Sequence, residues 1–112
     1  MGLITGCGVM AVELNDENFR KLTKQGNAVV DFYADWCGPC QMMKPVFEKV
    51  SKDVKGVNFF KLNVDNNPDT AAAYSVRSIP TLLFLKNNKE ADRMLGVMSE
   101  EDFKKKISSA FK

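Results

Sequence analysis

The sequence contains no histidine and only three cysteines among its 112 residues. A zinc site built from soft ligands alone would therefore lack its fourth ligand, and catalysis by a Cys-His pair is excluded. An odd, small number of cysteines is also unlike a secreted domain that disulfides hold together, since 45% hydrophobic residues can supply a core. These absences leave the cysteines for redox chemistry in a reducing compartment, and we expect a cytoplasmic protein.

The chain also lacks an excess of charge of either sign. Its 16 basic and 14 acidic residues give a formal net charge of +2. The densest basic run, residues 104–106, falls in an amphipathic pattern near the end of the chain and is interpreted as the solvated face of a helix. We therefore expect no nucleic-acid partner and no membrane partner.

The first twelve residues lack the features of a standard signal peptide or a membrane span. They are apolar, but they have no positive charge, are interrupted by three glycines and are too short to cross a bilayer. Residues 4–7 resemble the motif before a lipidated bacterial cysteine, without the upstream apolar segment. We expect residues 1–9 to form a flexible extension. Whether Cys7 is free, crosslinks two molecules or is lipidated stays open.

The most informative feature present is the pentapeptide Trp36-Cys37-Gly38-Pro39-Cys40, which follows an apolar, strand-like run and opens a helical pattern. Residues three positions apart in a helix lie on one face, with Cβ atoms roughly 5 to 6 Å apart. A disulfide can close there with little backbone movement. The pair is therefore interpreted as a reversible dithiol.

The two thiols are expected to differ in role. Cys37 lies at the first turn, where free N–H groups and the helix dipole stabilise a thiolate, so we interpret it as the nucleophile. Cys40 lies one turn inside, is expected to be less exposed, and is interpreted as the resolving thiol. Gly38 and Pro39 suit a helical first turn and bring no positive charge, which favours a reductant over an oxidant.

Periodicity along the rest of the chain predicts one compact α/β domain. Strands are predicted at residues 28–34, 57–64, 81–85 and 93–97, the last two joined by a short turn that implies a hairpin. Helices are predicted after Asn15, over residues 39–54, from Asn67 and after Ser99. Strands that alternate with helices indicate parallel pairing, with an antiparallel pair at one side.

Residues 31–40, 61–65 and 79–81 together resemble the thioredoxin family. The resemblance covers roughly residues 10–112. It implies a thioredoxin fold, a central mixed sheet of four to five strands flanked by four helices, with the cysteines at the tip of the strand that ends near Ala34. Two departures stand near the cysteines: Tyr33 replaces a frequent Trp, and Gln41 replaces a frequent Lys.

The resemblance also implies roles for residues outside the cysteine pair. Asp31 would lie beneath Cys40 with a raised pKa and accept its proton; alternatively it is a tolerated buried acid paired with Lys61. Trp36 would be an exposed platform for partner proteins; alternatively it belongs to the core. Ile79 and Gly96 would belong to an apolar rim that accepts an extended substrate segment; alternatively they serve ordinary packing and a turn. Pro80 would follow a cis peptide bond and pack beside the disulfide; alternatively its bond is trans and it ends a loop.

The family resemblance implies a general protein disulfide reductase that acts on disulfide-containing proteins. No Gly-rich phosphate-binding loop is present, so we expect no cofactor in this chain and expect a separate thioredoxin reductase to recycle it. We expect a monomer and no bound metal. Two alternatives stay open: an oxidase or isomerase of secreted proteins, and a non-catalytic binding module that uses the same apolar rim.

Overall fold

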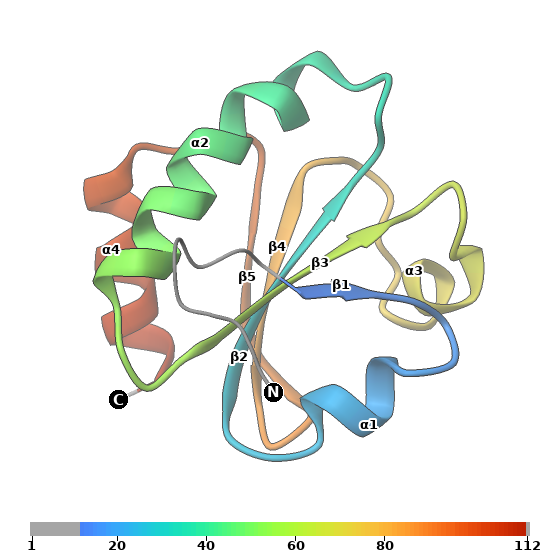
Figure 1. Cartoon of the computed structure of the whole chain (residues 1–112), viewed down its shortest axis with the longest axis horizontal. Coiled ribbons are helices and arrows are strands. Elements are labelled where there is room, and N and C mark those ends of the chain that lie inside the picture. Colours follow the sequence, from blue (N-terminus) through green and yellow to red (C-terminus); the bar gives the residue numbers. More distant parts are fainter. Residues whose placement is uncertain (1–11, 112) are drawn as a thin grey trace.

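The computed structural model describes residues 12–111, so the expected extension at residues 1–9, with Cys7, lies outside the described residues. Strands and helices alternate along this part of the chain, except that the last two strands follow one another directly (Figure 1). In chain order the elements are β1 (Val12–Leu14), α1 (Phe19–Thr23), β2 (Asn27–Tyr33), α2 (Gly38–Asp53), β3 (Asn58–Asn63), α3 (Pro68–Ala73), β4 (Thr81–Lys86), β5 (Lys89–Leu95) and α4 (Glu100–Ala110).

The strands form one mixed sheet in the order β1-β3-β2-β4-β5. β3 runs parallel to both β1 and β2, whereas β4 is antiparallel to β2 and to β5. The predicted fold, a mixed sheet flanked by four helices with a hairpin at one side, is confirmed. None of the helices in residues 12–111 is long and apolar enough to span a bilayer.

Alternation along β2 sends its side chains into two separate cores. Val30 and Phe32 pack with α1 and α3 on one face of the sheet, whereas Val29 packs with α2 and α4 on the other. Figure 1 shows the two helix pairs on opposite sides of the sheet. Because strand residues two apart share a face, Asp31 points with Val29 toward α2. The fold thus places this acid beneath the helix that carries the cysteines.

Three boundaries differ from those that periodicity predicts. β1 was not predicted, because it has only three residues and two of them are exposed. β5 begins at Lys89 rather than near Arg93, since an edge strand with few buried residues shows little hydrophobic alternation. α1 begins at Phe19 because Asn15 accepts hydrogen bonds from the N–H groups of Glu17 and Asn18 in a turn that precedes the helix.

Candidate active site

The loop after β2 places the two cysteines at the start of α2. Cys37 is the N-cap residue, and its Sγ accepts a hydrogen bond from the backbone N–H of Cys40 at 3.2 Å. The two residues form a disulfide, with Cα atoms 5.2 Å apart. Gly38 begins the helix and Pro39 follows in its first turn, where a missing N–H group removes no helical hydrogen bond. The predicted dithiol geometry is confirmed.

The expected difference in exposure between the cysteines is wrong, because both residues are 5% exposed. The side chains pack into one small cluster with Ala34, and the partly buried Ile79 lies against it. What separates the two sulfurs is their position relative to the helix. Cys37 stands at the positive end of α2, whereas Cys40 lies one turn in and lines the cavity that holds Asp31.

The loop before β4 brings a second segment against the disulfide. The Ile79-Pro80 bond is cis, as the family resemblance implies. The carbonyl oxygen of Ile79 lies 3.9 Å from Sγ of Cys37. The N–H of Gly96, which has φ +86°, donates to the carbonyl oxygen of Pro80 at 2.8 Å. The segment of Ile79 and Pro80 therefore meets the cysteine pair, and Gly96 is bound to that segment.

Trp36 lies on the surface beside this cluster and not in the core, with 71% of its area exposed. Its indole Nε1–H donates to Oδ2 of Asp65 at 2.7 Å. Met42, Leu95 and Val97 are also large apolar side chains that are exposed. The bond to Asp65 fixes the indole while leaving its apolar surface available.

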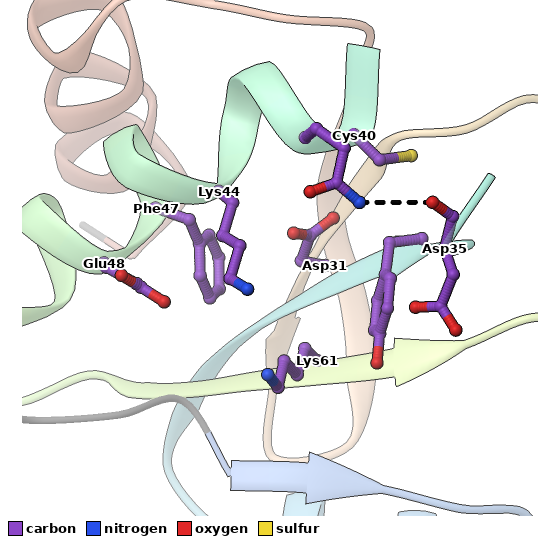
Figure 2. A pocket seen from close by; sticks show the side chains of 9 residues that line it. Asp31, Asp35, Cys40, Lys44, Phe47, Glu48 and Lys61 are labelled. Atoms are coloured by element: carbon purple, nitrogen blue, oxygen red, sulfur yellow. Dashed lines mark hydrogen bonds between the residues drawn. The ribbon is translucent and has the colours of Figure 1, made fainter. Parts of the chain in front are cut away.

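Asp31 is 6% exposed and lies in a cavity of about 150 Å³ under α2 (Figure 2). Its Oδ1 has no hydrogen-bond partner within residues 12–111. Burial raises the pKa of Asp31 to about 7, while the positive charge of Lys61 opposes the rise. The cavity is lined by Asp31, Tyr33, Asp35, Cys40, Gln41, Lys44, Phe47, Glu48 and Lys61. A carboxyl group that titrates near neutrality thus shares a cavity with one of the two cysteines.

Lys61 occupies the register position next to Asp31 on β3. The structure shows no direct ion pair between these two side chains; the Lys61 ammonium instead lies 3.8 Å from Oε1 of Glu13. Glu13 also accepts hydrogen bonds from the Tyr33 hydroxyl at 2.8 and 3.0 Å. Sequence reasoning missed Glu13, because its strand is too short to be recognised from periodicity.

Gln41, Lys44 and Glu48 are further site residues that sequence reasoning left without a role in the cavity. The Gln41 side-chain amide donates to the carbonyl oxygen of Asp35 at 3.2 Å, the dashed bond at Asp35 in Figure 2. Lys44 and Glu48 follow Cys40 at intervals of four, so helical periodicity alone could have placed them on the face of Cys40. Within residues 12–111, no group of three or more candidate ligands is arranged to hold a metal ion.

Comparisons with known proteins agree with this geometry. The family model for thioredoxin matches residues 10–109. The chain is 45% identical to "Thioredoxin 2" of Chlorobaculum tepidum over 98 residues, which cover 85% of this chain and 90% of that one. It is 42% identical to a thioredoxin of Staphylococcus aureus over 92 residues, covering 81% and 88%.

A solved structure is similar over nearly the whole length. A mutant thioredoxin from Halobacterium salinarum superposes with a TM-score of 0.85 at 31% identity, covering 96% of each chain. The cysteine pair at the start of α2, the sheet order and these matches support the same assignment. The chain belongs to the thioredoxin family of protein disulfide oxidoreductases and has the cysteine pair with which that family carries out dithiol-disulfide exchange.

Proposed function

We propose that this chain is a general protein disulfide reductase in which Cys37 is the nucleophile, Cys40 the resolving thiol and Asp31 the proton acceptor. The observation that carries the proposal is that the two cysteines have different surroundings. The Sγ of Cys37 accepts a backbone N–H hydrogen bond at the helix start, while Cys40 and Asp31 line the same cavity under α2. Each sulfur thus has a different chemical environment at the same exposure.

In the first step the Cys37 thiolate attacks one sulfur of a target disulfide. A new S–S bond forms between Cys37 and the target, and the second target sulfur leaves as a thiolate that takes a proton from solvent. The N–H of Cys40 and the positive end of the 16-residue helix α2 stabilise the attacking thiolate. Gly38 and Pro39 support this step by forming a first turn without a competing charge.

In the second step Asp31 accepts the proton of the Cys40 thiol. The resulting thiolate attacks Sγ of Cys37, the Cys37-Cys40 bond forms as the mixed disulfide breaks, and the target sulfur leaves as a thiolate that takes a proton from solvent. The cavity beside Asp31 has the volume and the polar groups to admit water as a proton relay. The Cys37-Cys40 disulfide of the structure is the product of this step. Because Asp31 titrates near pH 7, it can act as a base at neutral pH.

Protein targets would bind on the exposed apolar surface around the disulfide. Trp36 supplies a fixed aromatic platform through its bond to Asp65. Ile79 packs against the cysteine pair, and Gly96 is joined to the same loop by its hydrogen bond to Pro80. An extended target segment that crosses this rim would place its disulfide over Cys37.

The oxidised protein then needs an external reductant. We propose a separate thioredoxin reductase for this role, with no cofactor held in this chain. The family assignment and the absence of a Gly-rich phosphate-binding loop from the sequence support this division of labour. We also propose that the protein is a monomer, lies in the cytoplasm and acts on disulfide-containing proteins.

Trapping the mixed disulfide tests the assignment of the two cysteines. In a Cys7→Ser background, Cys40→Ser should accumulate a covalent adduct with insulin through Cys37, whereas Cys37→Ser should form none, and both should lose turnover. Full insulin reduction by Cys37→Ser would overturn the mechanism. A Cys37→Ser/Cys40→Ser double variant that still rescues function in cells would instead favour the binding-module alternative.

A further inference from the structure

Three ionisable residues form a row across the parallel part of the sheet. Glu13 on β1 is the register partner of Lys61 on β3, and Lys61 is in turn the partner of Asp31 on β2. Adjacent strands lie about 4.8 Å apart, so a single cation stands between two acids. The Lys61 ammonium can approach either carboxyl group, and its position determines how strongly its positive charge acts on Asp31.

The structure shows Lys61 turned toward Glu13. The Lys61 ammonium lies 3.8 Å from Oε1 of Glu13 and 5.9 Å from the centre of the Tyr33 ring. The Tyr33 hydroxyl donates to both carboxylate oxygens of Glu13, which fixes that acid in place. Asp31 Oδ1, by contrast, has no hydrogen-bond partner within the described part of the chain.

We propose that Glu13 is a positioning residue that holds Lys61 on the β1 side of the sheet and thereby keeps Asp31 basic enough to take the Cys40 proton. The inference rests on the proposed role of Asp31. If Glu13 lost its charge, Lys61 would be free to turn toward Asp31. The nearby cation would then stabilise the carboxylate and make it a weaker base.

The electrostatic contributions to Asp31 agree with this arrangement. Burial raises the pKa of Asp31, the positive charge of Lys61 lowers it, and the negative charge of Glu13 raises it. On the β4 side the register partner of Asp31 is the uncharged Leu82. The other charged or titratable groups around the cavity come from α2 and from the end of β2 with its following loop; they are Cys40, Lys44, Glu48, Tyr33 and Asp35. None of these groups is altered in the variants Glu13→Gln, Glu17→Gln and Lys61→Gln.

The direct test is the titration of the Asp31 carboxyl carbon by NMR in the oxidised, full-length protein carrying Cys7→Ser. Glu13→Gln keeps an acceptor for the Tyr33 hydroxyl and removes only the charge. The midpoint of the Asp31 titration should fall in Glu13→Gln. It should stay in place in Glu17→Gln, which removes the same charge from an exposed turn. Equal midpoints in the two variants would overturn the proposal.

A second comparison separates positioning from a simple charge effect. In a Lys61→Gln background, Glu13→Gln should lower the midpoint less than it does when Lys61 is present, because only the direct effect of the Glu13 charge remains. The same fall in both backgrounds would show that Glu13 does not act through Lys61, which would also overturn the proposal.

The kinetic readout distinguishes this inference from the proposed function. The acid limb of the pH profile for resolution of the Cys37 mixed disulfide should move to lower pH in Glu13→Gln, together with the Asp31 midpoint. If the midpoint falls and the profile does not move, Glu13 does position Lys61 but Asp31 is not the proton acceptor. If the midpoint does not fall, the inference about Glu13 is wrong whatever Asp31 does.

Discussion

Replacing Asp31 with asparagine should make the stability of the oxidised protein less dependent on pH between pH 5 and pH 8. Asp31 is 6% exposed, and burial raises its pKa from an ordinary value of 3.8 to about 7. Because the folded-state pKa is the higher one, folding favours the protonated carboxyl. The stability contributed by this proton is complete at pH values below 3.8 and is lost as the pH rises toward 7.

The size of the effect follows from the two pKa values. Each pKa unit corresponds to about 1.4 kcal/mol, so above pH 7 the buried carboxylate costs about 4 kcal/mol of folding free energy. At pH 5 the folded protein keeps Asp31 protonated while the unfolded chain is largely ionised, and the cost is about 2 kcal/mol. The wild-type protein should therefore lose about 2 to 3 kcal/mol from this one group between pH 5 and pH 8.

The assay is urea unfolding of oxidised wild-type and Asp31→Asn proteins at pH 5, 6, 7 and 8. Asparagine changes packing and hydrogen bonding by an amount that does not vary with pH, so the change in the difference between the two proteins isolates ionisation. The surface carboxyl groups with lowered pKa values, such as Asp92 beside Lys106, are common to both proteins and cancel. The free energy of unfolding of Asp31→Asn should rise relative to wild type by about 2 to 3 kcal/mol from pH 5 to pH 8. A difference that is the same at both pH values would refute the raised pKa of Asp31.

Three further substitutions test the rim and the helix cap. Gly96→Ala should destabilise the protein by about 1 kcal/mol, because Gly96 has φ +86°. Gly38→Ala is the control and should not destabilise it, because Gly38 has no positive φ and has open space around it. Urea midpoints measure both effects. Trp36→Ala should change stability by less than about 0.5 kcal/mol, because the side chain is largely exposed. It should raise KM for insulin and leave the rate with a small aromatic disulfide unchanged. An equal loss of activity with both substrates would contradict the role of Trp36 as a platform for proteins. Ser99→Ala should cost about 1 kcal/mol, since the Ser99 hydroxyl accepts from the first turn of α4, and Ser108→Ala on an exposed position of the same helix is the matched control.

The chemistry of the site could be predicted from the sequence because it depends on local geometry. Two cysteines three positions apart at a helix start must share a face, and Gly38 and Pro39 suit the turn that places them there. Asp31 is the one charged residue in an apolar strand-like run, and strand alternation determines which face of the sheet it occupies. The cis bond before Pro80 could be expected only from the family resemblance, because cis bonds occur in about 5 to 6% of X-Pro pairs.

What could not be predicted depends on contacts between distant segments. β1 has three residues and is defined by its pairing with β3, so the position of Glu13 beside Lys61 has no signature in the sequence. The equal exposure of Cys37 and Cys40 likewise depends on the loop of Ile79, which lies 42 residues away in the sequence and packs over the first sulfur. Local spacing predicted the reacting atoms, while tertiary packing determined their environment.

The most direct test of a reductase is the reduction potential of the Cys37/Cys40 couple. It would be measured in a Cys7→Ser background by equilibration against glutathione. A couple more reducing than the cytosolic glutathione pool is the predicted result, because no positive charge lies between the cysteines to stabilise the Cys37 thiolate of the reduced form. A potential of about −180 mV or higher, in the range of the secretory compartment, would contradict the account and favour an oxidase or isomerase.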